Sequence, residues 1–159
     1  MTDTTDVRIA LGQVAGVHAL PLRALDDLAA CGTGRAVGAG TTLANEGDDA
    51  TYLYVVIEGR VAIDTHTPGD GTLVLETLGR GELVGWSWLV PPHRWRFAVR
   101  AVDDTDLVEI DAAALRDRCI VDPELGFTLA RHVVAGLAAR LEATRLRLLD
   151  LYAPPPGGR

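Results

Sequence analysis

Residues 35–110 alternate short runs of β-forming residues with glycines. The clearest run, residues 52–57, is broken by Glu58-Gly59 and followed by alternating apolar residues over 61–65. Short strands with frequent turns are typical of a sandwich or a small barrel. The pattern therefore predicts an antiparallel β-roll, in which 52–57 and 61–65 form a hairpin. Glycines at 38, 40, 47, 59, 69, 71, 79, 81 and 85 suit its tight corners.

Helix-forming patterns lie on both sides of this region. Before it, Pro21 opens a short amphipathic stretch that glycines end. After it, Asp111 is placed to cap one helix, and Asp122-Pro123-Glu124 marks the start of another. No proline follows until Pro154, which allows a helix of roughly 42 Å at about 1.5 Å per residue. The predicted fold class is α+β, a jelly-roll-like antiparallel β-roll with an N-terminal helix and a long C-terminal dimerisation helix.

The long helix carries apolar residues on two faces. One line, in steps of four and three, is typical of a coiled-coil seam and predicts a homodimer. The other is expected to cover the β-roll, so that each face has a partner. If both lines lie inside one molecule, the chain is instead a monomer. The seam is Ala130, Val134, Leu137, Leu141, Thr144, Leu148 and Leu151, and the second line is Leu129, Val133, Leu146 and Leu149.

The ends of the chain are expected to be less ordered than its middle. Residues 1–16 show no clear period and are predicted to form a flexible segment. The β-roll with its flanking helices is expected over 17–121, and the long helix over 122–152. The Pro/Gly-rich residues 153–159 are predicted to form a disordered tail.

The composition limits the kinds of partner that we expect for the protein. Its 159 residues include 15 Lys and Arg against 22 Asp and Glu, a formal charge of −7, opposite to that of most nucleic-acid binders. The N-terminus does not resemble a secretory signal, and no apolar run reaches the roughly 18 residues that span a membrane. We therefore expect a cytoplasmic protein without nucleic-acid or membrane partners. The two cysteines and four histidines show no disulfide framework or metal-ligand spacing, so no metal and no cofactor are expected.

Residues 81–101 concentrate side chains that suit ligand binding. They hold all three tryptophans of a chain that is only 5% aromatic, and Arg94 and Arg96 flank Trp95. A glycine turn that opens a short helix leaves backbone N–H groups free for an anion, and arginine can grip phosphate oxygens. Two interpretations stay open. The stretch is either a small anion pocket with an aromatic wall or a buried turn whose tryptophans fill the core.

The order of elements and several motifs resemble the cyclic nucleotide-binding domain of the catabolite-activator (Crp/Fnr-like) family. The resemblance covers roughly residues 17–152 and implies a β-roll that binds a cyclic nucleotide such as cAMP beside a long helix. Its segments are Ala39-Gly40-Thr41-Thr42-Leu43, Glu46-Gly47-Asp48, residues 53–61, Gly79-Arg80-Gly81-Glu82-Leu83-Val84-Gly85 and Val99-Arg100-Ala101.

The phosphate-binding cassette departs from that family. There, a glutamate accepts a hydrogen bond from the ribose 2′-hydroxyl where this chain has Trp86, whose indole only donates. The resemblance puts the phosphate-binding arginine at Trp95 without a gap, or at Arg96 with one extra loop residue, and Arg94 lies on the other side. Strand alternation predicts that Arg94 and Arg96 share a face.

The resemblance also implies a role for Thr144, because a threonine of the family's long helix meets the adenine. A register-setting polar residue in a dimer seam explains Thr144 equally well. In the family's transcription factors a helix-turn-helix domain follows the long helix. Only about eight residues follow Leu151 here, so no DNA-binding domain is expected.

Two functions remain open, and neither is enzymatic, because the chain carries no recognised catalytic motif. The first is a regulatory module that binds a cyclic-nucleotide-like anion and signals to a protein partner. The alternative is a ligand-free structural or interaction module that dimerises through its C-terminal helix. The predicted ligand-binding residues are Gly85, Trp86, Ser87, Arg94, Trp95, Arg96 and Thr144.

Overall fold

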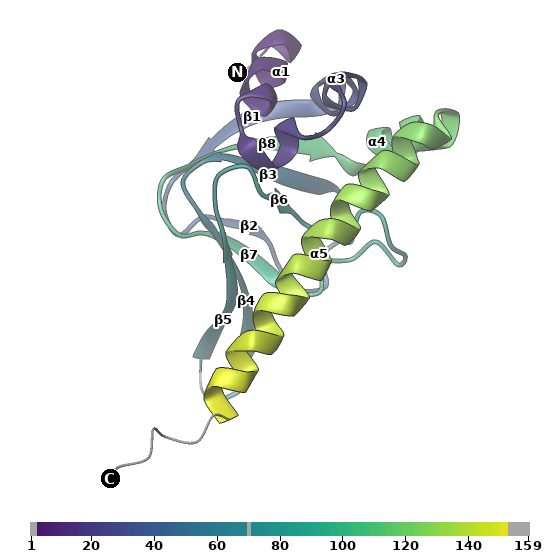
Figure 1. Ribbon diagram of the computed structural model, residues 1–159. Coiled ribbons are helices and arrows are strands. Elements are labelled where there is room, and N and C mark those ends of the chain that lie inside the picture. The colour runs from purple at the N-terminus through teal and green to yellow at the C-terminus, as the bar shows by residue number, and fades with distance from the viewer. Residues whose placement is uncertain (1–2, 70, 153–159) are drawn as a thin grey trace.

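The computed structural model describes residues 3–69 and 71–152, except for the side chain of His18. Two four-stranded antiparallel sheets pack together, and helices cover the outer face of one of them (Figure 1). This arrangement confirms the predicted α+β class and β-roll. The first sheet contains, in order, β1 (Gly32–Val37), β8 (Thr105–Asp111), β3 (Tyr52–Glu58) and β6 (Leu83–Val84), and the second contains β2 (Thr42–Ala44), β7 (Ala98–Ala101), β4 (Val61–Thr67) and β5 (Gly71–Leu78).

Strand β3 shows how the sequence builds two apolar cores. Side chains alternate along a strand, so Leu53 and Val55 join the cluster under the helices, whereas Tyr54 and Val56 join the cluster between the sheets. All four side chains are buried because both faces of the strand are covered. This double burial is why residues 52–57 form a continuous apolar run rather than an alternating one.

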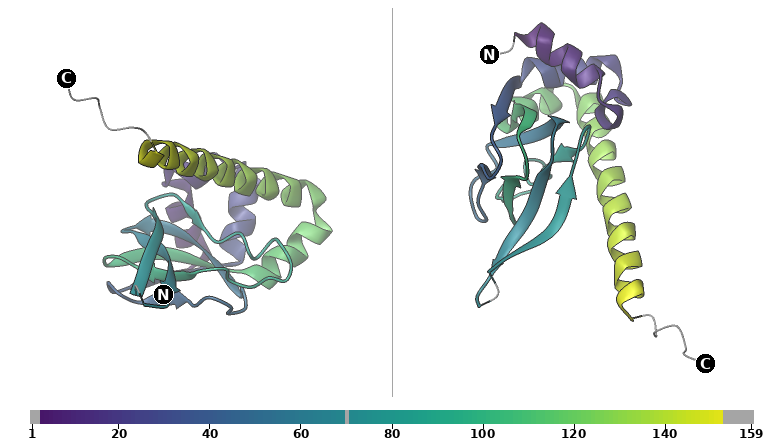
Figure 2. Two further views of the ribbon diagram at one scale, coloured as in Figure 1. Left: turned by 90° about the horizontal axis from the view of Figure 1, so that it is seen from below. Right: turned by 90° about the vertical axis from the view of Figure 1, so that its left-hand side faces the viewer.

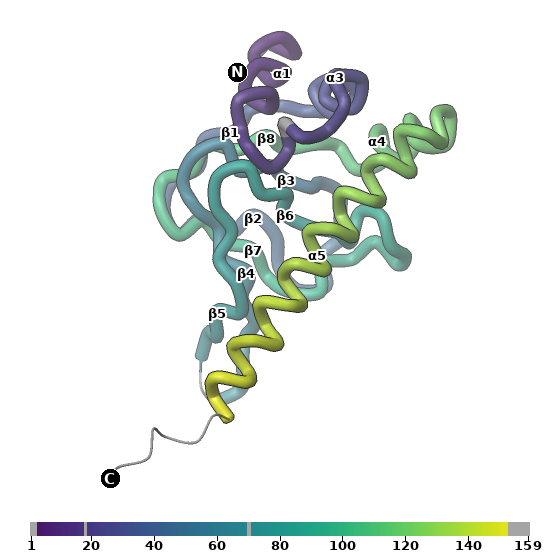
Figure 3. Tube along the Cα trace, in the orientation of Figure 1, coloured from purple at the N-terminus to yellow at the C-terminus, as the bar shows by residue number. Residues whose placement is uncertain are grey.

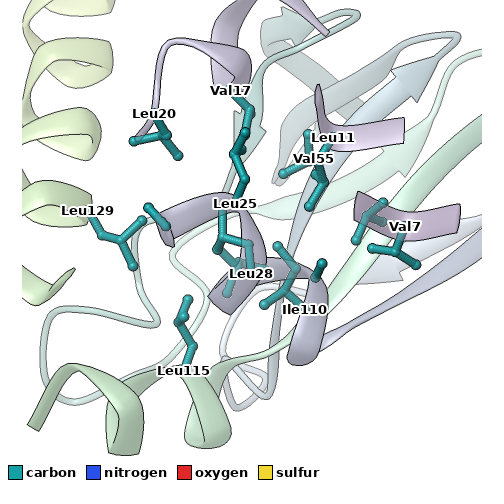
Figure 4. Packing of buried hydrophobic residues seen from close by; sticks show 14 of the residues in the cluster. Val7, Leu11, Val17, Leu20, Leu25, Leu28, Val55, Ile110, Leu115 and Leu129 are labelled. Atoms are coloured by element: carbon teal, nitrogen blue, oxygen red, sulfur yellow. The ribbon is translucent and has the colours of Figure 1, made fainter. Parts of the chain in front are cut away.

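Within the described residues, five helices close the helix-side core: α1 (Thr4–Gly12), α2 (Ala15–His18), α3 (Leu22–Ala30), α4 (Ala112–Val121) and α5 (Pro123–Tyr152). Figure 4 shows Leu25 and Leu28 of α3 among side chains from the other helices and from β8. The predicted caps are present. Asp111 accepts a hydrogen bond from the N–H of Ala114 (2.8 Å), and Asp122 accepts one from the N–H of Leu125 (3.2 Å).

The N-terminal region differs from its prediction as a flexible segment. Residues 4–12 form α1, whose Val7 and Leu11 are fully buried against the helix-side core. Figure 3 shows α1 and α3 over the end of the roll that carries β1 and β8. One buried pair four residues apart is too short a pattern to reveal a helix in the sequence. The predicted disordered tail, 153–159, lies outside the described residues.

The predicted hairpin of residues 52–57 with 61–65 is wrong. Strand β3 pairs with β6 and β8, whereas β4 pairs with β5 and β7, so the chain crosses from one sheet to the other at Gly59. The hairpin is formed by β4 and β5 instead. A glycine turn indicates that the chain reverses, but tertiary packing selects the strand with which it then pairs.

The buried apolar residues of helix α5 all lie in its first half. Leu125, Leu129 and Val133 are buried, whereas all residues from 141 to 152 are exposed. Both views of Figure 2 show α5 running along one side of the roll. The second apolar line therefore covers the roll through Leu129 and Val133, as predicted, but its distal members Leu146 and Leu149 are exposed.

Candidate functional site

Strand β6 leads directly into the turn at which the sequence predicts a ligand pocket. Gly85 follows it with a φ of 96°, and residues 86–90 form a turn in which the Leu89 N–H donates to the Trp86 carbonyl (3.1 Å). The short helix expected after Gly85 is not formed, because Pro91 and the residue after it have no N–H to continue one. In the described chain, no partner accepts from the backbone N–H groups of Trp86 and Ser87. Anion-binding donors are therefore present without the helix.

The three tryptophans take different places, two in the apolar cores and one half-buried beside a cavity. Trp88 is buried in the helix-side core, and its indole N–H has no partner there. Trp95 is buried in the core between the sheets, where its ring stacks on Tyr54 at a centroid distance of 6.2 Å. Burial raises the pKa of Tyr54 to about 12, so its hydroxyl stays protonated and donates to the Leu43 carbonyl (3.2 Å). Trp86 is half-buried and faces a cavity.

This cavity has a volume of about 810 Å³ and lies between the turn, strands β4 and β5, and helix α5. Small-molecule sites typically measure roughly 300–1,000 Å³, so its size suits a nucleotide-sized ligand. The structure brings most of the predicted site residues together around it. Those that line the cavity are Gly85, Trp86, Ser87, Trp95, Arg96 and Thr144.

The two arginines beside Trp95 have different surroundings. Arg94 does not line the cavity, and its guanidinium donates to the Gly47 carbonyl (2.9 Å) and pairs with Asp49 (3.3 Å). Arg96 lines the cavity and has no hydrogen bond or ion pair in the described chain. The prediction that both share one face does not hold, because Arg94 forms an isolated bridge and Arg96 lies in a bend rather than in one continuous strand.

Helix α5 contributes polar residues that the sequence did not single out as site residues. Arg140 donates to the Leu83 carbonyl of β6 (2.9 Å) and pairs with Glu76 of β5 (3.3 Å), so it ties the helix to both neighbouring strands. Arg147 also lines the cavity and makes no ion pair in the described chain. Thr144 donates its hydroxyl hydrogen bond to the Arg140 carbonyl (2.9 Å). Arg140 lies four residues before Thr144 and Arg147 lies three residues after it, so all three share one face of the helix. This spacing is the sequence signal that could have identified the two arginines.

His132 is another residue of α5 that lines the cavity. It lines the cavity beside the buried Val133, and burial lowers the pKa of its imidazole below the ordinary value. The ring is therefore neutral at pH 7. The charged groups that line the cavity are then three arginines and two glutamates, which leaves a positive excess that favours an anionic ligand.

Other kinds of site find no support in the part of the chain that the structure describes. No three His, Cys, Asp or Glu side chains there are grouped to hold a metal ion. No helix in that part is both long and apolar enough to cross a membrane. Cys31 and Cys119 are free thiols, and burial raises the pKa of both, so neither is an activated nucleophile.

Comparison with known proteins identifies relatives of this chain. The family model of the cyclic nucleotide-binding domain matches residues 35–120, more than half of the chain. Over 120 residues the chain is 30% identical to the cAMP-activated global transcriptional regulator CRP of Haemophilus influenzae, an alignment that covers 75% of this chain and 52% of that protein. The chain thus spans about half the length of the curated regulators that it matches.

Solved structures agree on the fold. The N-terminal domain of a transcriptional regulator from Streptomyces coelicolor A3(2) aligns with a TM-score of 0.64 and 27% identity, covering 94% of this chain and 99% of that one. A cyclic nucleotide-binding domain from Methylobacillus flagellatus aligns with a TM-score of 0.75, covering 95% of this chain and 85% of that one. At 18% identity, the second comparison supports the fold alone.

Proposed function

The chain belongs to the cyclic nucleotide-binding domain family, and we propose that its cavity binds a cyclic-nucleotide-like anion and that a protein partner responds to the occupied state. One observation carries this proposal. A single cavity combines an unpaired guanidinium, two unused backbone N–H groups and an indole face, contributed by Arg96, Trp86 and Ser87. Curated relatives from Haemophilus influenzae and Mycobacterium tuberculosis are cAMP-activated regulators, which supports the same class of ligand.

In this proposal, Arg96 pairs with the phosphate, because it is the cassette arginine that faces the cavity without a partner. The N–H groups of Trp86 and Ser87 donate to further phosphate oxygens. The half-buried Trp86 ring packs against the base, and Thr144 meets the ligand from α5. Arg94 takes no part, since Asp49 and the Gly47 carbonyl already engage its guanidinium.

In this proposal, helix α5 transmits the effect of ligand binding to the partner protein. Its first half is fixed by Leu125, Leu129 and Val133, whereas beyond it Arg140 provides the hydrogen bond and ion pair to the strands. A ligand that contacts both the turn and α5 favours the helix positions in which both contacts form, and it shifts the population toward them. The partner reads this change in α5.

The test compares two neighbouring arginines. We expect Arg96→Gln to weaken binding of cAMP or cGMP about tenfold to 150-fold, because a charge-assisted hydrogen bond contributes roughly 1.5–3 kcal/mol. Arg94→Gln is the matched control and should change the Kd less than about twofold. Intrinsic tryptophan fluorescence reports the titration, because Trp86 and Trp95 line the cavity. Equal losses in the two variants would refute the role of Arg96, and no response up to millimolar nucleotide would favour a ligand-free module.

A second candidate function, dimerisation through α5, rests on its exposed apolar residues. Val134, Leu141, Leu148 and Leu151 of the predicted seam are at least 48% exposed. Leu137, by contrast, packs against the helix-side core. We propose that a second copy of the chain covers Val134, Leu148 and Leu151, which do not line the cavity, whereas Leu141 and Thr144 of the same seam do.

The dimer is tested by a substitution outside the cavity. Leu148→Arg places a charge in the seam without touching the cavity lining, and we expect it to halve the mass measured by light scattering. Asp150→Arg adds the same side chain beside the seam and should leave a dimer intact. A wild-type protein with the mass of one chain would exclude the dimer at the concentration measured.

A further inference from the structure

Three large apolar side chains that line the cavity are exposed to solvent, and each comes from a different element. Leu75 of β5, Phe97 just before β7 and Leu141 of α5 are 39%, 41% and 51% exposed. Single apolar residues scattered over a surface are ordinary, but several that gather at one concave site mark a surface that a ligand or partner covers. The three side chains therefore indicate that the occupant of the cavity presents an apolar group.

Helix α5 adds a wall of small side chains to the same cavity. The residues of this wall that have at most one side-chain carbon are Ala135, Gly136, Ala139 and Ala143. A Cβ atom added at Gly136 would meet nothing within 4 Å, so there is open space in front of the helix. Methyl groups offer contact area but no hydrogen-bond partner, and this wall therefore suits a hydrocarbon chain or ring.

The arginines of the cavity indicate that the occupant also carries an acidic group. Arg96 and Arg147 line the cavity and make no ion pair in the described chain. The arginines that line it outnumber the glutamates by three to two. Charge complementarity therefore favours an anion. A hydrocarbon body and an acidic group together define an amphipathic organic anion.

We propose that the cavity binds amphipathic organic anions, in which a hydrocarbon body carries one acidic group, in addition to the cyclic-nucleotide-like ligand. This inference rests on the proposed function for the role of Arg96, which pairs with the acidic group in both cases. It adds Leu75, Phe97 and Leu141 as the side chains that cover the hydrocarbon body. The affinity then rises with the length of the hydrocarbon, because each buried methylene group is removed from water.

The test measures Kd values for butanoate, hexanoate, octanoate and decanoate, all below their micellar concentrations. Calorimetry and tryptophan fluorescence report binding, because Trp86 and Trp95 line the cavity. We expect the Kd to fall about twofold to fourfold for each added CH₂ group. Kd values that agree within about threefold from butanoate to decanoate would overturn the inference. Arg96→Gln should weaken all four carboxylates by a similar factor and leave the dependence on chain length unchanged.

Two leucines of β5 provide a matched pair of variants. Leu75 lines the cavity, whereas Leu73, two residues before it and 55% exposed, does not. Leu75→Asn should weaken decanoate at least about threefold and leave butanoate within about twofold, because only the longer chain reaches the apolar contact. Leu73→Asn should leave both Kd values unchanged. Equal effects of the two variants would refute the role of Leu75. A lower mass of Leu75→Asn in light scattering would show that a second copy covers these side chains, and would also refute the inference.

Titration with cAMP separates this inference from the proposed function. If cAMP binds and the Kd of the carboxylates does not depend on chain length, the inference fails and the proposed function stands. If the carboxylates show the expected dependence and cAMP does not bind, the inference stands and the cyclic-nucleotide-like ligand is excluded. If neither binds, both fail.

Discussion

The contact between Gly85 and Trp95 gives the sharpest test of how the turn is built. Gly85 has a φ of 96°, a backbone conformation that side chains with a Cβ atom rarely adopt. A Cβ atom at this position would also lie 2.5 Å from Cη2 of Trp95, whose ring stacks on Tyr54. The substitution Gly85→Ala therefore adds backbone strain and a collision with a buried ring.

The two costs can be estimated separately. A left-handed backbone costs a residue other than glycine about 1–2 kcal/mol. Forcing a methyl group against a packed aromatic ring costs about 1–3 kcal/mol in addition. We expect Gly85→Ala to lower the free energy of unfolding by about 2–5 kcal/mol, or the Tm by roughly 4–20 °C for a domain of this size.

Gly40 offers a matched control, because its φ is 82° and a Cβ atom there would meet nothing within 4 Å. Gly40→Ala should therefore carry only the backbone cost. Urea unfolding followed by tryptophan fluorescence gives both free energies, provided that the slopes agree. If the two variants lose equal stability, Trp95 does not pack against Gly85 and the assignment of its ring to the core beside the turn is refuted.

The remaining predictions concern α5. Leu129→Ala should lower the free energy of unfolding in urea by about 2–5 kcal/mol, because Leu129 is buried in the helix-side core. Leu149→Ala, at an exposed position, should lower it by less than about 0.5 kcal/mol. Equal losses would mean that the distal half of α5 is also packed. Burial lowers the folded-state pKa of His132, so its contribution to stability is complete above the unfolded pKa of about 6.5 and is lost as the pH falls toward the lower folded pKa. His132→Gln should therefore lose less stability than the wild type between about pH 7.5 and 5.5, and parallel losses would contradict this account.

The sequence predicted the elements whose signals are local. Asp111 and Asp122 cap the helices that they were expected to cap, because capping depends on atoms within three residues of the cap. The run at 52–57 was identified as a strand from its β-forming residues, and the structure shows that both of its faces are buried. The short N-terminal helix was missed, since its two buried residues, Val7 and Leu11, carry too little periodicity.

Part of the candidate site could be predicted from the sequence, and part could not. Gly85, Trp86 and Ser87 are neighbours in the chain, and their glycine turn is visible in the sequence. The cavity between them and α5 depends on helix packing more than 40 residues away, so His132 and Arg147 were not recognised as lining residues. Sequence spacing also left Arg94 and Arg96 equivalent, and only the contacts of Arg94 with residues 47–49 distinguished them.

By itself the sequence determined the α+β class, the glycine-rich corners and the start of the long helix, because each is a property of neighbouring residues. The tertiary structure decided which sheet each strand joins, which tryptophans line the cavity and which of Arg94 and Arg96 is left unpaired. These features depend on contacts between segments far apart in the chain, where burial and competing partners outweigh local preference.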